Sequence, residues 1–170
     1  EDFIAFLGKN LSTEGLCESY FRNVRFEWDE FKRYMHFNSS FYTRNVICRT
    51  QQFELMLLCW NGQQKTPIHD HNGSDGWTWC LAGEIEEMRY TLEYGKPKFL
   101  SKTQVSSSIY THINDDKALH CMQNSSEGQG VSLHLYAPPI RSCRSYCLET
   151  GEIKTRHMSD YSMEGKLVGS

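Results

Sequence analysis

Several features that would assign the chain to a broad class of protein are missing from its sequence. No segment reaches the ~18 consecutive apolar residues that a membrane-spanning helix requires. The first residues carry neither the basic region nor the apolar run of a secretory signal. Lys and Arg total 18 against 21 Asp and Glu, and no basic block is present to follow a phosphate backbone. We therefore expect a cytoplasmic protein with neither a membrane nor a nucleic acid as its partner.

The cysteines also argue against a protein stabilised by disulfide bonds. Seven are present, an odd number without any C-x-x-C pair. This pattern favours reduced thiols over a disulfide framework. Most of these cysteines are expected to be small buried side chains.

The length of the chain predicts one domain. At 170 residues it can bury a full hydrophobic core, and it is short for two domains. We predict a helical cap over residues 1–38, a barrel over residues 39–157 and a C-terminal tail over residues 158–170. We also expect the protein to be a monomer.

The apolar pattern changes from a helical to a strand period near residue 40. The earlier part predicts two or three short helices, carried by the groups Phe3, Phe6 and Leu7; Leu16, Tyr20 and Val24; and Trp28, Phe31 and Met35. The later part is a series of short strand-like runs separated by Gly, Asn, Asp and Pro. These runs are 41–49, 53–60, 66–71, 77–82, 85–92, 107–113, 119–123, 130–137, 143–148 and 153–157. Helices followed by many short strands predict a mainly β sandwich or barrel with antiparallel pairing.

One of these runs, residues 66–71, contains two histidines separated by one residue. On a strand, His69 and His71 would share a face while Asp70 turns away. Two imidazoles about 6–7 Å apart along a strand can both reach one metal ion if the strand curves around it. The same triplet also occurs on solvated strands and loops, so the pattern alone leaves both interpretations open.

A third histidine begins a later strand. His120 follows an Asp-rich turn and is placed to complete a set of three metal ligands with His69 and His71. By itself, His120 would also fit a structural histidine whose hydrogen bonds are satisfied inside the protein. The metal site therefore remains a hypothesis that needs a wider pattern.

The strand at 130–137 carries a row of polar side chains. Ser132, His134 and Tyr136 alternate with apolar residues, so they share one face. A hydroxyl, an imidazole and a phenol in one row suggest a hydrogen-bonded relay, although the solvated face of an edge strand would look similar. The prolines at 138 and 139 end the strand because proline cannot donate to the ladder.

Taken together, these motifs resemble a known family. The spacing Gly62, His69-x-His71, Gly83 and His120-x-x-x-Asn124 resembles the two motifs of cupin barrels, with one extra residue before His69. More closely, the chain is similar to the cysteine dioxygenase family of thiol dioxygenases over about residues 20–157. The segments that match in order and spacing are 42–45, 58–60, 68–71, 113–115 with 119–120, and 131–136 with 138–139.

The resemblance implies a fold, a cofactor and a reaction. The expected fold is a cupin (jelly-roll) β-barrel with a short N-terminal helical segment. The expected site is one Fe(II) held by His69, His71 and His120. The expected enzyme transfers both atoms of O2 to the sulfur of L-cysteine and forms cysteine sulfinate. Its partners would be these small molecules alone.

Gly76 departs from both patterns. Most cupins have a glutamate ligand at this position, so the set here would be three neutral histidines. In animal cysteine dioxygenases the position is a cysteine that is cross-linked to the tyrosine equivalent to Tyr136. Without a sulfur at Gly76, Tyr136 should remain an ordinary phenol, as in many bacterial members.

The resemblance and the chemistry together suggest roles for four more residues. An arginine inside a barrel is costly unless it meets an anion, and a guanidinium pairs well with a carboxylate. Arg44, with Tyr42 beside it, is the predicted clamp for the substrate carboxylate. Tyr136 would donate a hydrogen bond to the substrate or to oxygen, with His134 and Ser132 orienting it. The tryptophans at 60, 77 and 79 are expected in the core or the wall.

Three alternatives stay open at this point. A 3-mercaptopropionate dioxygenase resembles the family closely but has glutamine at the position of Arg44. A non-catalytic cupin that binds a small metabolite would not need the full row on strand 130–137. Three histidines can also hold zinc for hydration or hydrolysis chemistry, and only metal analysis distinguishes that case.

Overall fold

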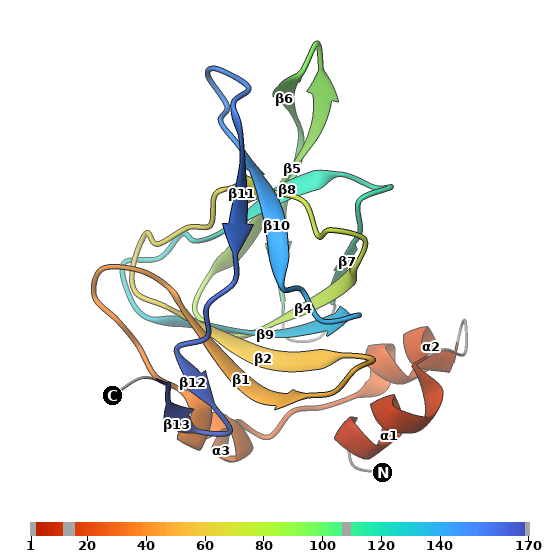
Figure 1. The fold of residues 1–170 in the computed structure, drawn as a ribbon. Helices are drawn as coiled ribbons and strands as arrows, with labels where there is room; N and C mark the ends of the chain where they lie inside the picture. The colour runs from red at the N-terminus through yellow and green to blue at the C-terminus, as the bar shows by residue number, and fades with distance from the viewer. Residues whose placement is uncertain (1–2, 12–15, 107–109, 169–170) are drawn as a thin grey trace.

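The computed structural model describes residues 3–11, 16–106 and 110–168 of the chain. Nearly half of these residues lie in strands that form two packed sheets, with a few short helices at the N-terminal side (Figure 1). The helices are α1 (Phe3–Asn10), α2 (Leu16–Asn23), α3 (Trp28–Phe31) and the 3-10 helix η1 (Lys32–Tyr34). Among the described residues, no helix is long and apolar enough to cross a membrane.

The first sheet has seven strands, and its central members are buried on both faces. In spatial order they are β13 (Lys166–Leu167), β12 (Ser162–Met163), β1 (Thr43–Arg49), β2 (Glu54–Trp60), β9 (Gly130–Ala137), β4 (Asp75–Ala82) and β7 (Thr111–Ile113). The pairing of β1 with β12 is parallel, and the other pairings in this sheet are antiparallel. Strands β12 and β13 lie within the range predicted as a tail, and they extend this sheet.

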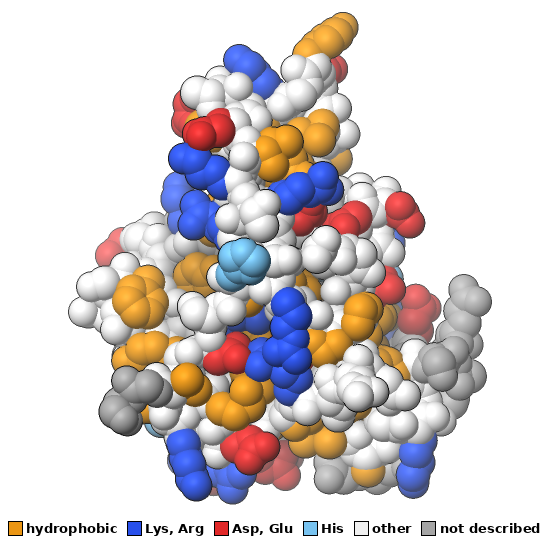
Figure 2. Space-filling view, viewed as in Figure 1, with side chains coloured by type: hydrophobic (Ala, Val, Ile, Leu, Met, Phe, Trp, Pro, Cys, Tyr) orange, Lys and Arg blue, Asp and Glu red, His pale blue; other side chains and the backbone are white. Residues whose placement is uncertain are grey.

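The second sheet has six strands and carries two of the three histidines predicted as metal ligands, His69 and His120. Its order is β11 (Ile153–His157), β10 (Ser142–Tyr146), β3 (Ile68–His69), β8 (Leu119–Asn124), β5 (Ile85–Glu93) and β6 (Lys96–Val105). All of its pairings are antiparallel. The hairpin of β5 and β6 extends beyond the body of the sandwich, and its tip carries exposed hydrophobic side chains, Tyr94 among them (Figures 1 and 2).

The seven-stranded sheet separates two hydrophobic cores. Alternate residues of β2 and β9, such as Leu57 and Leu133, pack with Phe6, Leu7 and Phe21 of the helices in one core. The residues between them face the interior of the sandwich, where Met56, Leu58 and Trp60 pack with Cys80 and Met122. Because successive side chains of a strand point to opposite faces, one strand serves both cores. The helices therefore cover the outside of the sheet whose inside faces the site.

The predicted mainly β fold with two or three N-terminal helices is confirmed, and most predicted strands appear within two residues of their expected bounds. Three differences matter. Strand β6 was not predicted, because Pro97 and a polar, exposed composition conceal it. The predicted strand 66–71 is reduced to β3, so His71 lies beyond its end. Of the predicted strand 107–113, only 111–113 is a strand, and 107–109 lie outside the described residues.

Candidate metal centre

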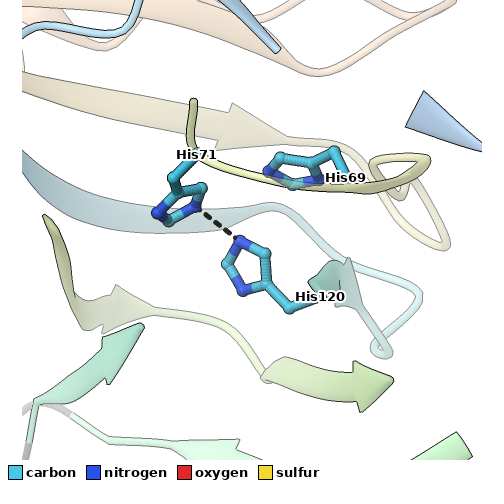
Figure 3. Close-up of side chains that lie close together, drawn as sticks. All are labelled: His69, His71 and His120. Atoms are coloured by element: carbon cyan, nitrogen blue, oxygen red, sulfur yellow. Dashed lines mark hydrogen bonds between the residues drawn. The ribbon is translucent and has the colours of Figure 1, made fainter. Parts of the chain in front are cut away.

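Three histidine side chains converge between the sheets, as the sequence predicted. His69 in β3 pairs directly with His120 in β8 across the antiparallel ladder, and His71 lies just past the end of β3. Each offers one ring nitrogen, and these nitrogens all lie within 4.8 Å of one another. Figure 3 shows the three rings pointing toward one another, with 2.8 Å between Nε2 of His71 and Nε2 of His120.

Two of these rings are oriented by hydrogen bonds at the nitrogen that faces away from the cluster. Nδ1 of His69 lies 2.9 Å from the carbonyl oxygen of Pro67, and Nδ1 of His120 lies 2.8 Å from Oε1 of Glu87. Since a carbonyl or carboxylate can only accept, Nδ1 carries the proton in each ring. Nε2 of each ring therefore keeps a lone pair directed at the cluster, which is the usual arrangement for a histidine ligand.

His71 is positioned by a tight loop and not by a strand. The carboxylate of Asp115 accepts hydrogen bonds from the backbone N–H of His71 at 2.6 Å and of Gly73 at 2.7 Å. Gly73 has a φ of 83°, a left-handed conformation that glycine adopts without strain. The strand predicted to carry both histidines ends at His69, so a loop positions His71, but the two rings still lie on the same side.

Asp70, between the two histidines, points away from them as predicted. Its carboxylate accepts hydrogen bonds from the backbone N–H of Arg144 at 2.8 Å, from Nε of Arg144 at 2.5 Å and from the hydroxyl of Tyr146 at 3.1 Å. Asp70 is buried, so these contacts compensate the cost of removing its charge from water. They anchor the segment that carries both ligands to β10.

Burial keeps the three imidazoles neutral. It lowers the pKa of His69, and it lowers the pKa of His71 and His120 well below the usual range, with further lowering from the neighbouring imidazoles. A neutral imidazole has the lone pair that a metal ion needs, whereas an imidazolium has none. The donor chemistry and the convergence of the rings therefore fit a single divalent transition-metal ion.

The row on β9 forms the hydrogen-bonded relay that was predicted. Oγ of Ser132 lies 2.7 Å from Nε2 of His134, and the hydroxyl of Tyr136 lies 3.0 Å from Nδ1 of His134. Trp60, expected only as core or wall, adds to the row by donating from Nε1 to Oγ of Ser132 at 2.9 Å. Oγ1 of Thr78 lies 3.1 Å from Nδ1 of His134. The solvated-face alternative is excluded, because Ser132, His134 and Tyr136 are all buried.

Burial also sets the protonation of the relay. It lowers the pKa of His134 well below its usual value, and Arg44 lowers it further. Burial raises the pKa of Tyr136 above its usual value, although Arg44 opposes the shift. At neutral pH the relay therefore consists of a neutral imidazole and a protonated phenol.

A cavity of about 180 Å³ connects His69 and His120 with His134 and Tyr136 of the relay and with Arg44. It lies between the two sheets, on the side of β1, β10 and β11, and we call it the metal-side cavity. Its described lining residues are Tyr42, Arg44, Leu58, Thr66, Pro67, His69, His120, Met122, His134, Tyr136, Cys143, Arg156 and Met158. None of these residues has a carboxylate, whereas two have guanidinium groups. The cavity is therefore suited to a small anionic molecule.

Arg44 already meets an anion inside the protein, which the sequence reasoning missed. Its Nη2 lies 3.4 Å from Oε1 of Glu54, and its Nε is buried without a hydrogen-bond partner among the described residues. Glu54 also accepts from Nε of Arg49 at 2.7 Å and from the backbone N–H of Ile140 at 3.0 Å. The sequence contained one signal of this contact, because Glu54 is the one carboxylate in the otherwise apolar run 53–60. Because the Arg44 contact is long and Glu54 has better partners, the guanidinium retains capacity for a second anion.

Tyr42 lies beside Arg44 in the cavity wall, as predicted. Its ring stacks on Trp60 with centroids 4.9 Å apart. Burial raises the pKa of Tyr42 and Arg44 opposes the shift, so the phenol stays protonated. The structure thus brings together all of the residues proposed from the sequence, and their catalytic and binding roles remain predictions.

Comparisons with known proteins identify relatives of the chain. The family model described as cysteine dioxygenase type I matches residues 12–148. The protein named cysteine dioxygenase type 1 from Danio rerio is 35% identical over 161 residues, which cover 90% of this chain and 77% of that protein. The one from Homo sapiens is 31% identical over 141 residues, which cover 80% and 70%.

Solved structures support the fold alone. A protein from Thermus thermophilus aligns with a TM-score of 0.54 at 18% identity, over 64% of this chain and 93% of that one. A protein with a double-stranded β-helix domain from Klebsiella pneumoniae aligns with a TM-score of 0.51 at 16% identity, over 79% and 91%. The predicted cupin-type jelly roll is consistent with this likeness.

Proposed function

The chain belongs to the cysteine dioxygenase family and is an enzyme of that class, and we propose that it uses one Fe(II) ion to convert L-cysteine and O2 to cysteine sulfinate. The observation that carries the proposal is the metal-side cavity, which is lined by two members of the three-histidine cluster, His69 and His120, together with a guanidinium and a protonated phenol. A cavity of about 180 Å³ suits a molecule the size of an amino acid.

The metal would be held by Nε2 of His69, His71 and His120. With no carboxylate in the set, the ligands do not neutralise the charge of a divalent cation. An Fe(II) ion bound there would supply Lewis acidity and lower the pKa of a coordinated thiol. Three imidazoles bind zinc, copper and iron alike, so the choice of iron rests on the family.

Arg44 would bind the carboxylate of the substrate. A guanidinium offers paired N–H groups that match a carboxylate, and a charge-assisted bond is stronger in a desolvated site. Nε of Arg44 has no partner among the described residues, so a carboxylate would satisfy a donor that is otherwise buried alone. Tyr42, with its protonated hydroxyl, is placed to donate to the same group.

The relay would hold the proton of Tyr136 toward the cavity. Trp60 can only donate, so Oγ of Ser132 accepts from it. If the Ser132 hydroxyl donates to Nε2 of His134, then Nδ1 of His134 carries the proton and donates to the oxygen of Tyr136. The proton of Tyr136 is then free to bond to the substrate or to oxygen. His134 and Ser132 thereby act as positioning residues for the phenol.

The test is a single-turnover experiment with defined metal content. Protein loaded anaerobically with Fe(II) is mixed with L-cysteine, oxygen is admitted, and oxygen uptake and cysteine sulfinate are followed together. We expect one sulfinate per O2 consumed, and no product from zinc-loaded protein. Oxygen uptake without sulfinate, or equal turnover with zinc, would contradict the proposal.

A further inference from the structure

A second cleft opens on the other side of the sandwich, toward the edges formed by β6 and β7. It has a volume of about 670 Å³, and we call it the far cleft. Strand β7 is the last strand of one sheet and β6 is the last of the other. The described residues that line the cleft are Arg22, Glu87, Arg89, Ser101, Thr103, Tyr110, Thr111 and His112. Glu87 is the group that connects this cleft to the metal centre, through His120.

The far cleft has more positive than negative charge available to a ligand. Of the described lining residues, Glu87 is the one with a carboxylate, and both of its oxygens are engaged. Oε1 contacts Nδ1 of His120 at 2.8 Å, and Oε2 accepts from Nε and Nη2 of Arg89 at 3.0 and 2.8 Å. The Arg89 side chain remains 26% exposed, and Arg22 is exposed beside the phenol of Tyr110, to which it is hydrogen-bonded.

His112 does not supply a free ligand group to the cleft. Its Nε2 lies 2.8 Å from Oδ1 of Asp75 and its Nδ1 lies 2.7 Å from Nζ of Lys117, while its ring stacks on Trp77. The carboxylate of Asp75 is thus occupied by His112 and by Asn114. Arg89 also donates from Nη2 to the carbonyl oxygen of His112 at 2.8 Å, so its Nε and Nη2 are both engaged within the protein. The groups left to meet a ligand are Nη1 of Arg89, the guanidinium of Arg22 and the neighbouring hydroxyls.

We propose that the far cleft is a binding site for a small oxyanion, such as a carboxylate, sulfate or phosphate group, held between Arg22 and Arg89. Guanidinium groups bind planar and tetrahedral oxyanions through paired, charge-assisted hydrogen bonds. The hydroxyls of Ser101, Thr103 and Thr111 line the same space and can donate to the remaining oxygens. This site does not depend on the proposed dioxygenase activity.

Hydrogen bonds through Glu87 link this anion site to the metal centre. An anion that binds Arg89 weakens the ion pair between Arg89 and Glu87. Glu87 then becomes a stronger acceptor for the N–H of His120, and this makes His120 a better metal ligand. The negative charge of the anion also favours a cation among the three histidines. Both effects have the same sign, so anion and metal should each strengthen the binding of the other.

Equilibrium dialysis of the metal-free full chain against radiolabelled sulfate, with chloride added to hold the ionic strength constant, tests the site. We expect one saturable sulfate in the far cleft, in addition to any sulfate that the metal-side cavity takes up. Arg22→Gln should weaken its binding about tenfold or more, because one charge-assisted contact is lost. Arg22 is exposed on α2, so this change does not threaten the fold.

Two variants serve as controls with the same change of charge. Lys98→Gln lies on β6 outside the cleft, and Arg156→Gln lies in the metal-side cavity. Lys98→Gln should bind sulfate as the wild type does, and Arg156→Gln should keep the sulfate of the far cleft. Sulfate binding that is lost in Arg156→Gln and kept in Arg22→Gln would place the anion in the metal-side cavity and overturn the proposal. Absence of saturable binding in the wild type would do the same.

The coupling between the anion site and His120 is tested by a separate measurement that does not depend on enzyme turnover. Cobalt(II) affinity is measured by competition with a chelator, with and without saturating sulfate. We expect sulfate to tighten cobalt binding in the wild type and not in Arg22→Gln. An equal gain in cobalt affinity in both proteins would mean that sulfate acts at the metal itself. No gain in either protein would contradict the proposed coupling between the two sites.

Discussion

Gly76 lies directly opposite Tyr136 in the pairing of β4 with β9, and the imidazole of His71 packs against the same point. A Cβ atom at residue 76 would lie 2.6 Å from Cε1 of His71 and 3.2 Å from Cε1 of Tyr136. The first distance is well inside van der Waals contact. The absence of a side chain at residue 76 is therefore what lets His71 and Tyr136 approach each other here.

We expect Tyr136 to remain unmodified through turnover. No sulfur is present at residue 76 to form a thioether with its ring. The intact-protein mass should equal the sequence mass after repeated turnover with Fe(II), cysteine and oxygen. A deficit of two hydrogens in a peptide containing Tyr136 would contradict this expectation and would implicate Cys143, which lines the same cavity.

Gly76→Ala should lower the metal content of the protein. The added methyl group would push the His71 ring out of the cluster, leaving two well-placed ligands. Iron per chain would be measured after loading and desalting, with circular dichroism to check the fold. Gly128→Ala is the matched control, because a Cβ there meets nothing closer than 4.0 Å. Full iron content in Gly76→Ala would contradict this prediction and would show that the loop carrying His71 can shift to accommodate the methyl group.

Replacement of His69, His71 or His120 by Ala should empty the site or abolish activity while leaving the barrel folded. Each substitution removes one of three neutral donors, and two imidazoles alone hold a divalent ion far less tightly. Metal analysis of the three variants would be compared with His157→Ala, which is exposed on β11. Stoichiometric iron with normal turnover in His120→Ala would rule out its assignment as a ligand.

Arg44→Gln should reduce turnover of cysteine by about tenfold or more and shift selectivity toward 3-mercaptopropionate. A charge-assisted contact in a desolvated pocket contributes roughly 1.5–3 kcal/mol, and each ~1.4 kcal/mol is a factor of ten. Glu54 keeps its contacts with Arg49 and Ile140, so its charge is not left unpaired. Cysteamine, which lacks the carboxylate, should be a poor substrate of the wild type.

The measurement for this substitution is kcat/KM for cysteine and for 3-mercaptopropionate in both proteins. An unchanged ratio in Arg44→Gln would remove the basis for the cysteine assignment. A wild type that prefers 3-mercaptopropionate would favour the rival dioxygenase in its place.

The metal-free protein should lose stability as the pH falls below about 6.5. Burial lowers the pKa of His69, His71, His120 and His134 in the folded state. Below their ordinary pKa the unfolded chain takes up protons that the folded chain does not, so the free energy of unfolding decreases with falling pH. Each such group contributes at most about 1.4 kcal/mol per pH unit. Urea unfolding across this range, with His134→Gln as a less sensitive variant, measures the effect; a flat profile would contradict it.

Sequence patterns predicted the strands and the site residues that carry a strong local signal. The alternation along 130–137 indicated both the bounds of β9 and the relay face, because an apolar face and a polar face differ at every residue. The exposed β6 lacks such a contrast, and its Pro97 is typical of a turn. Local pattern therefore missed β6, although it did identify the other exposed edge strand of this sheet, β11, at residues 153–157.

Local sequence patterns could not predict contacts between segments that are distant in the chain. The bond from Glu87 to His120 spans 33 residues and the bond from Asp115 to His71 spans 44. Neither carboxylate has a neighbour in the sequence that indicates its partner. The position of His71 was right for an incorrect reason, since the Asp115 loop holds it where a strand was expected. Such partners become visible only when the topology places the strands together.

The alternation of β9 also constrains how the protein can fold. Val131, Leu133 and Leu135 pack beneath the helices, while Ser132, His134 and Tyr136 lie on the opposite face, where His134 and Tyr136 line the cavity. A slip of one residue against β2 or β4 would bury the three polar groups among the phenylalanines of the helical cap and turn the leucines toward the metal. A misregistered chain would thus lose its core and its relay in one step. Errors of strand pairing are therefore penalised by the same side chains that form the relay.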